Sequence, residues 1–241
     1  NFNDEEFLQS HYVVFATKQG IIKKTRLDAY KNVRAAGVIA INVNEGDEVV
    51  GVRLTNGHNE LLLANRNGRA VRFDENDVRT MGRVSTGVIG MRLDGDDDEV
   101  VGLVCVNDPQ TETIMVVSEN GYGKRSEVED YRKTARGAKG VKTLAITEKT
   151  GRLVAIKVVT DENDLMIINK SGVLIRLKVA DVRVMGRATQ GVRLINLAKK
   201  NDVIASVCKV QHSEENDDIE EAEVVNDAEA PETQAPETNN E

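Results

Sequence analysis

The stretch VRTMGRVSTGVIGMRL, residues 78–93, returns 104 positions later as VRVMGRATQGVRLINL, residues 182–197. A catalytic site needs its special residues only once, so a phrase that recurs at this length indicates a structural repeat. Four strand-like runs, each followed by a turn that ends in glycine, mark the repeats: YVVFAT (12–17), ELLLAN (60–65), TIMVVS (113–118) and DLMIIN (164–169). The quoted stretch is therefore the long loop of one repeated unit, together with the strand that follows it.

Each unit has the same order of parts. The turn glycines Gly20, Gly68, Gly121 and Gly172 are spaced 48, 53 and 51 residues apart, and a second strand follows each turn, which predicts a β-hairpin. A polar loop and two more apolar runs complete the unit. Four strands per repeat of this length are typical of propeller-like arrays, whose blades pack face to face. The sequence predicts an all-β fold with these parts: a lead-in at 1–9, blades at 10–57, 58–109, 110–161 and 162–211, and a tail at 212–241.

The composition agrees with a strand-rich protein. Among 241 residues there is no Trp, and there are only 4 Phe and 4 Tyr, so the core must be built from Val, Ile and Leu. No segment resembles a signal peptide, and no apolar run approaches the roughly 18 residues of a membrane span. We expect a cytoplasmic protein with no membrane partner.

The charge is unevenly distributed along the chain. The formal net charge is −8, but residues 213–241 hold twelve acids and no Lys or Arg, so removing them leaves +4 for residues 1–212. A tail of this composition cannot bury enough apolar surface to fold, and we expect it to be disordered. The mildly basic body indicates a polyanionic partner. The acidic tail either competes with that partner for the basic body or serves only as a solubilising terminus.

Basic residues recur at three fixed positions after each turn glycine. The first basic column lies four residues after the glycine and the second lies eleven after it, while the third lies inside the loop. In this order the columns are Lys24, Arg72, Arg125 and Arg176; Lys31, Arg79, Arg132 and Arg183; and Arg34, Arg83, Arg136 and Arg187. Lys139 adds a further positive charge to the third loop. Around an axis of blades, such columns predict a basic track along the rim that suits DNA phosphates.

Strand alternation gives the first column a direction. In VRF (71–73) and IRL (175–177) the flanking apolar residues belong to the core, which predicts that Arg72 and Arg176 face solvent. The alternative is that the arginines only support local structure. In that case Asp77, Asp130 and Asp181, two residues before the second column, are the expected partners.

The remaining polar clusters do not form a catalytic site. Cys105 and Cys208 are expected to be buried, reduced strand residues, and DGDDDE (94–99) is expected to be a turn between strands rather than a metal site. No nucleophile with a base, metal-ligand spacing or cofactor fingerprint occurs. We therefore expect the chain to be non-catalytic and to need no cofactor of its own.

Several phrases resemble the C-terminal domain family of bacterial DNA gyrase A subunits. They are NGYGKR (120–125), RGAKGVKTLAI (136–146) and the two loops quoted above, and the likeness extends over residues 10–211. The resemblance implies a β-pinwheel, a propeller-like disc whose blades exchange a strand and whose basic perimeter wraps double-stranded DNA. It also implies two protein partners, the N-terminal domain of the gyrase A subunit and the gyrase B subunit, in an A2B2 enzyme. That enzyme supercoils DNA negatively with ATP and Mg held on other domains.

The chain departs from that family in two ways. The family's disc normally has six blades, whereas four units occur here, and the basic, glycine-rich box of its first blade has no upstream equivalent. Two alternatives remain open. One is the related C-terminal domain of the topoisomerase IV A subunit, and the other is a propeller that serves as a scaffold for protein interactions, for which exposed aromatic clusters would be expected.

Overall fold

A computed structural model describes residues 4–197 and 202–212 of the chain. Each repeat begins with a hairpin, whose first strands are β1 (Tyr12–Thr17), β4 (Glu60–Asn65), β8 (Thr113–Ser118) and β12 (Asn163–Asn169). The second hairpin strands are β2 (Ile21–Arg26), β5 (Arg69–Asp74), β9 (Tyr122–Glu127) and β13 (Leu174–Lys178). The closing strands are β3 (Val49–Thr55), β7 (Val100–Val106), β11 (Leu153–Val159) and β15 (Ile204–Gln211).

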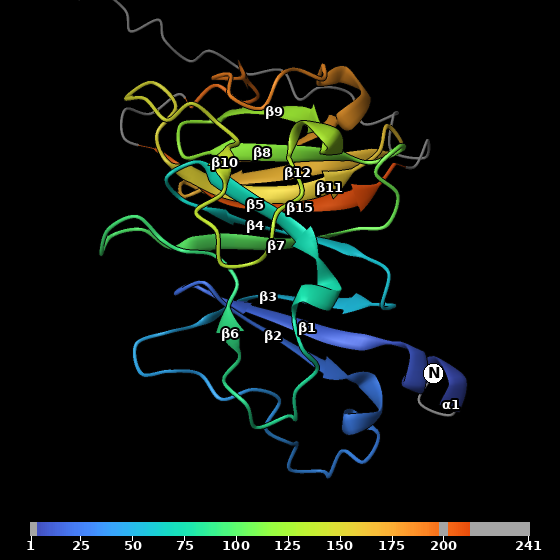
Figure 1. Cartoon of the computed structure of the whole chain (residues 1–241). Coiled ribbons are helices and arrows are strands. Elements are labelled where there is room, and N and C mark those ends of the chain that lie inside the picture. The colour runs from blue at the N-terminus through green and yellow to red at the C-terminus, as the bar shows by residue number, and fades with distance from the viewer. Residues whose placement is uncertain (1–3, 198–201, 213–241) are drawn as a thin grey trace, which may run out of the picture.

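Short strands in the long loops join neighbouring repeats. They are β6 (Val88–Ile89), β10 (Val141–Lys142) and β14 (Val192–Arg193). Each one pairs antiparallel with the second hairpin strand of the preceding repeat, so β6 adds to β2, β10 to β5 and β14 to β9 (Figure 1). The resulting sheets have the orders β3-β1-β2-β6, β7-β4-β5-β10 and β11-β8-β9-β14. The prediction of an all-β, propeller-like fold with exchanged strands is confirmed.

The fourth sheet differs from the prediction of four strands per blade. Among the described residues its order is β13-β12-β15, with three strands, whereas the fourth strand of every other sheet comes from the repeat that follows. The turn glycines also differ between the first blade, which the next repeat contacts, and the fourth blade. Gly20 has φ +83°, and its carbonyl accepts hydrogen bonds from Gly90 N (2.8 Å) and Met91 N (3.2 Å) of the next repeat. A Cβ on Gly20 would lie 2.4 Å from Met91 O, whereas a Cβ on Gly172 would meet nothing within 4 Å.

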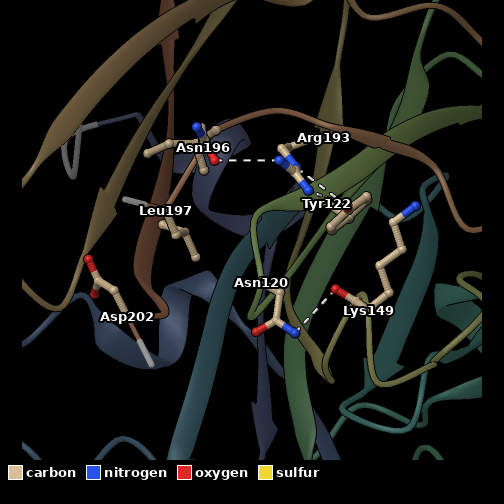
Figure 2. A pocket seen from close by; sticks show the side chains of 8 residues that line it. Asn120, Tyr122, Lys149, Arg193, Asn196, Leu197 and Asp202 are labelled. Carbon is tan, nitrogen blue, oxygen red and sulfur yellow. Dashed lines mark hydrogen bonds between the residues drawn. The ribbon is translucent and has the colours of Figure 1, made fainter. Parts of the chain in front are cut away.

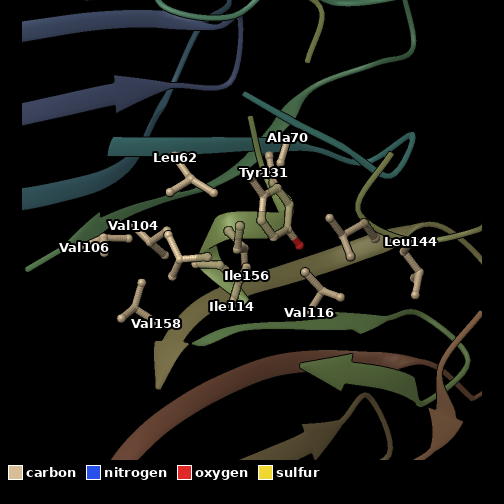
Figure 3. Packing of buried hydrophobic residues seen from close by; sticks show 13 residues of the cluster. Leu62, Ala70, Val104, Val106, Ile114, Val116, Tyr131, Leu144, Ile156 and Val158 are labelled. Atoms are coloured by element: carbon tan, nitrogen blue, oxygen red, sulfur yellow. The ribbon is translucent and has the colours of Figure 1, made fainter. Parts of the chain in front are cut away.

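Apolar residues from both faces of the inner sheets form three separate cores. One joins the first and second sheets through Val14, Phe73 and Leu103, and another joins the third and fourth through Met115 and Ile167. Between the second and third sheets, side chains such as Leu62, Ile114 and the fully buried Tyr131 converge (Figure 3). Both faces of the second and third sheets are therefore covered by neighbours.

The sheets have an inner and an outer edge. The closing strands β3, β7, β11 and β15 contact one another in succession, so they form the inner edge. The exchanged strands β6, β10 and β14 lie at the opposite edge of their sheets. The second hairpin strands lie next to this outer edge, and short 3-10 helices follow them: η1 (Leu27–Tyr30), η2 (Glu75–Asp77), η3 (Val128–Asp130) and η4 (Val179–Asp181). The long loops that carry the basic columns therefore emerge toward the perimeter.

The first described residues precede the repeats. The predicted lead-in contains a short helix, α1 (Glu5–Ser10), which is capped by the Asp4 side chain and lies beside β2 and η1. The predicted disordered tail, apart from His212, lies outside the described residues. Within residues 4–197 and 202–212, no helix combines the length and the apolar character needed to cross a membrane.

Candidate nucleic-acid interface

The first basic column lies between the blades rather than on the rim. Lys24, Arg72 and Arg125 are only 2%, 5% and 7% exposed. The prediction that Arg72 faces solvent is therefore wrong. Its flanking residues Val71 and Phe73 do face the core shared with the first blade, but the opposite face of the same strand is covered by the third blade.

Arg72 links the second and third blades. Its Nε donates to Glu60 Oε2 (2.5 Å), and Glu60 lies directly across from Asp74 in the same hairpin. Its Nη1 donates to the carbonyl oxygens of Val128 (2.9 Å), the first residue of η3 in the next repeat, and of Tyr131 (3.0 Å), which follows η3. Hydrogen bonds and charge pairing with Arg72 and Lys133 hold the pKa of Glu60 below its usual value, although burial opposes them. The guanidinium thus satisfies backbone carbonyls that would otherwise be buried without partners.

The other two buried members make equivalent contacts. Lys24 Nζ pairs with Glu75 Oε2 of the second blade (3.1 Å) and lies 4.3 Å from the centre of the Tyr12 ring. Arg125 donates from Nε to the carbonyl of Val182 and pairs through Nη1 with Asp161. The main chain takes part as well. The carbonyls of all three residues accept from the next repeat: Lys24 from Met81 N (2.8 Å), Arg72 from Thr134 N (2.9 Å) and Arg125 from Met185 N (2.9 Å).

Arg176, the fourth member of the first basic column, is not buried as the other three are. It belongs to the fourth blade, whose sheet has no exchanged strand among the described residues, and its side chain is 31% exposed. It pairs with Asp164 (2.6 Å), and His212 contacts the same carboxylate at 3.1 Å. For Arg176 the predicted exposure is confirmed, and the difference arises because no further sheet of the described residues covers this face.

The second basic column lies on the surface in all four repeats. Lys31, Arg79, Arg132 and Arg183 are exposed. Lys31 pairs with Glu5 of α1 (2.6 Å), whereas the three arginines form no hydrogen bond or ion pair with any residue that the structure describes. The alternative that Asp77, Asp130 and Asp181 neutralise this column is therefore wrong. Their side chains form no ion pair within the described ranges.

The third basic column holds the loops against the preceding blade and stays partly open to solvent. Arg136 donates to the carbonyls of Asp77 (2.9 Å) and Ile89 (3.0 Å). Arg187 repeats this one blade later, with the carbonyls of Asp130 (2.9 Å) and Lys142 (2.8 Å). Both use Nε and Nη1, which leaves Nη2 available to an anion. Arg83 bonds the Ile39 carbonyl (3.3 Å).

The two remaining predicted contacts lie on exposed segments. Arg34 is exposed, with no hydrogen bond or ion pair to a residue in the described part of the chain. Lys139 is also exposed, but its ammonium pairs with Asp94 at 2.5 Å, so the charge that it offers to a ligand is already balanced. Asp94 belongs to the DGDDDE segment, which forms the expected turn. Asp98 accepts from Asn65 Nδ2 (2.7 Å) and from Asp94 N (3.0 Å) across it.

Two buried lysines beneath the loops were missed by sequence reasoning. Lys23 donates to the carbonyls of Ala40 and Arg83, and Lys124 donates to Ser126 Oγ (2.9 Å). Burial lowers the pKa of each ammonium to about 8, and nearby arginines add to the effect. The available signal was their position three residues after the turn glycine, where the other repeats have Val71 and Ile175.

The cysteines differ from the prediction in part. Cys105 is half-buried, and burial raises the pKa of its thiol to about 12, so it stays protonated. Cys208 is exposed, contrary to prediction, because the inner strand β15 borders an open cavity rather than a core. No group of three or more metal-ligating side chains occurs among the residues with described coordinates.

This geometry defines a class of protein: a propeller-like repeat protein whose sheets share exchanged strands and whose outer loops carry unpaired arginines. Comparison with known proteins then identifies the family. A family model described as "DNA gyrase C-terminal domain, beta-propeller" matches residues 11–56, 59–107, 112–160 and 163–208. The chain belongs to this family.

Individual relatives agree with the assignment. The DNA gyrase A subunit of Staphylococcus aureus (strain MRSA252) is 45% identical over 212 residues, which cover 87% of this chain and 24% of the relative. The chain thus spans about a quarter of the length of the curated relatives it matches. Among solved structures, a DNA topoisomerase IV C-terminal domain superposes with a TM-score of 0.79 at 30% identity, covering 86% of this chain and 64% of that one. A DNA gyrase A C-terminal domain gives 0.74 at 27% identity, covering 86% and 68%.

Proposed function

We propose that the chain binds double-stranded DNA along its outer edge, without reading the base sequence, and bends the duplex around the blades. The observation that carries this proposal is the second basic column. Arg79, Arg132 and Arg183 recur once per blade on the same outward loop, are exposed, and have no acid partner among the described residues. Regularly spaced, unpaired guanidinium groups complement regularly spaced phosphates.

The third basic column supports the same proposal. Arg136 and Arg187 are held in place by backbone carbonyls of the preceding blade, so little side-chain entropy remains to be lost when an anion binds. In contrast, Lys24, Arg72 and Arg125 are buried, so we do not include them among the proposed DNA contacts. The proposed surface is therefore narrower than the sequence predicts, and it consists of the second and third columns.

The magnitudes are consistent with bending. Bending a site of 20–30 base pairs by 40–90° costs on the order of 1–6 kcal/mol, which must be offset by phosphate contacts made along the curve. A shorter arc of blades offers fewer contacts than a longer one. We expect this chain to bind DNA with less bending than a domain with six blades.

The wider assembly is part of the proposal. By analogy with the S. aureus relatives, which are DNA gyrase A subunits, the chain would be the C-terminal part of such a protein. The whole A subunit would act with the B subunit in an ATP-dependent enzyme that introduces negative supercoils. This chain would contribute the wrap and would itself bind no ATP, metal or other cofactor.

Topoisomerase IV remains the second candidate because a C-terminal domain of that enzyme superposes with a TM-score of 0.79. The identity of 45% to a gyrase A subunit favours gyrase. The intact protein, assembled with its partner and supplied with ATP, separates the two. Gyrase activity converts relaxed circular DNA to the negatively supercoiled form, whereas topoisomerase IV activity does not.

The binding proposal is tested with the chain itself and two duplexes of unrelated sequence, end-labelled for energy transfer. We expect equal affinity for both duplexes and a decrease in end-to-end distance on binding. The second and third columns offer eight candidate contacts, and a protein with 6–10 phosphate contacts loses about 10³–10⁵ in affinity between 50 and 200 mM salt. An affinity that is independent of salt would refute the proposal.

A further inference from the structure

The junction between the third and fourth blades holds a tyrosine between two cations. Tyr122 begins β9 and is paired across the exchanged strand with Arg193 of β14. Arg193 donates to the Tyr122 hydroxyl from Nη2 (3.0 Å) and Nε (3.3 Å), and its guanidinium lies 5.5 Å from the centre of the ring. Lys149, from the turn before β11, places its ammonium 5.4 Å from the same ring centre (Figure 2). Two positive charges therefore converge on one phenol.

The hydroxyl proton of Tyr122 has no acceptor among the described residues. A phenol accepts hydrogen bonds and donates one, and both contacts from Arg193 use its acceptor capacity. The residue is only 6% exposed, yet its O–H donates to no atom in the described part of the chain. The residue borders an open cavity, so this donor is available to an anion that enters it. The hydrogen bond from Arg193, together with the charges of Arg193 and Lys149, lowers the pKa of Tyr122, which reflects the same positive field.

A cavity of about 220 Å³ opens beside these groups. The amides of Asn120 and Asn196 also line it. Asn120 fixes the turn that carries Lys149, because its Nδ2 donates to the carbonyls of Glu148 (3.1 Å) and Lys149 (3.2 Å). The single acid of the lining, Asp202, accepts from Ser171 Oγ (2.7 Å) and lies on the side of the cavity away from Lys149 (Figure 2).

The equivalent junctions of the other blades do not have this arrangement. Between the first and second blades the matching pair is Ile21 and Ile89, which is apolar. Between the second and third blades it is Arg69 and Lys142, and there Asp94 lies 3.6 Å from Arg69.

The difference resides in the turn before the closing strand. In the second blade this turn is DGDDD (94–98), which supplies Asp94. In the third blade it is TEKTG (147–151), which supplies Lys149 to the cavity instead. The third junction thus differs from the second because its turn supplies a cation, rather than an acid, beside the exchanged strand.

We propose that Tyr122, Lys149 and Arg193 form a binding site for a phosphate group, and that its occupant is a backbone phosphate of DNA. This inference rests on the proposed function. The two cations neutralise the phosphodiester, and the unused O–H of Tyr122 donates to one of its oxygens. β14 is the outermost strand of its sheet, so the site lies at the edge along which the duplex would run.

The site adds a contact that the basic columns do not reach. Arg132 follows the far end of β9, and a strand of six residues spans about 20 Å at 3.3 Å per residue. The phosphate bound at Tyr122 therefore belongs to a different stretch of backbone from the one beside Arg132. Two separated anchors across one blade fix the orientation of the duplex as well as its affinity.

The test compares single-charge variants of the chain by salt titration of duplex binding. We expect Arg193→Gln and Lys149→Gln to lower the slope of log K against log salt by up to about 0.9, the value for one phosphate. Tyr122→Phe removes only the neutral donor, so it should weaken binding several-fold and leave the slope unchanged. Lys18→Gln is the matched control, because it removes one charge at the hairpin turn of the first blade, where Glu48 balances it at 2.8 Å.

Thermal unfolding of each variant separates loss of the site from loss of the fold, and Tyr122→Phe is the variant least able to disturb packing. If wild-type protein binds DNA and Arg193→Gln, Lys149→Gln and Tyr122→Phe all match Lys18→Gln, the phosphate site is refuted while the proposed function stands. If wild-type protein does not bind duplex DNA at all, the proposed function itself fails. A loss confined to the three site variants supports the site.

Discussion

Arg72 and Arg79 lie seven residues apart in the same blade and recur with the same period, yet their surroundings are opposite. Arg72 is enclosed between two sheets, where it bonds Glu60 and two carbonyls of the next blade. Arg79 is exposed and has no partner among the described residues. The comparison teaches that a repeated arginine can hold a repeat array together or present charge to a ligand, and that periodicity alone does not distinguish the two roles.

The largest expected effect is on the free energy of unfolding, which should distinguish the structural arginine from the exposed one. Arg72→Ala leaves two buried carbonyls without their partner and removes one of the two cations that pair with Glu60, the other being Lys133. Removing one member of a buried ion pair costs about 3–5 kcal/mol. Arg79→Ala removes no hydrogen bond or ion pair to a described residue, so its free energy of unfolding should stay within about 0.5 kcal/mol of wild type. Urea denaturation at neutral pH measures both. Equal losses for the two variants would contradict the assignment.

The next largest effect is a difference in stability between two members of the first basic column. Arg125→Ala removes the hydrogen bond to the Val182 carbonyl of the next blade and the ion pair with the exposed Asp161, and leaving that buried carbonyl without a partner should cost about 2–3 kcal/mol. Arg176→Ala breaks a partly exposed pair, and Asp164 keeps its contact with His212, so we expect a loss of about 1 kcal/mol. Denaturant midpoints of the two variants, measured side by side, check this order. The reverse order would show that the column does not act through the next blade.

The buried lysines should have a smaller effect on the free energy of unfolding, and this effect depends on pH. The folded-state pKa of Lys124 is about 8, below its ordinary value of 10.5, so the unfolded chain binds more protons between these two values. Stability should therefore rise for wild type relative to Lys124→Met as the pH increases from 8 to 10.5. Lys142→Met, which changes an exposed lysine of β10, is the control and should keep the wild-type rise. A flat difference between wild type and Lys124→Met would contradict the burial.

The smallest expected effect concerns the acidic tail. Residues 213–241 carry twelve acids and no base, and as a tethered polyanion they would compete with DNA for the exposed columns. Deleting them should tighten DNA binding several-fold at low salt, with little change at high salt, where the competition is screened. Unchanged affinity after deletion would show that the tail does not compete for the exposed arginines.

Much of the fold could be predicted from the sequence. The turn glycines and the alternation of the hairpin strands located all four repeats, because these patterns reflect local backbone geometry. The surroundings of the candidate site residues were harder to predict. Alternation in VRF assigns Val71 and Phe73 to one face of β5, but it cannot show that a second sheet covers the other face, where Arg72 lies. Similarly, the pairing of Tyr122 with Arg193 depends on strand exchange over 71 positions, which leaves no local signal.

The central claim is that the exposed arginines contact DNA while the buried ones hold the blades together. It is tested most directly by the salt dependence of DNA binding for the triple variant Arg79→Gln, Arg132→Gln and Arg183→Gln. Three lost phosphate contacts should lower the slope of log K against log salt by about 2.7. The free energy of unfolding should match that of wild type. An unchanged slope in a fully folded triple variant would contradict the claim.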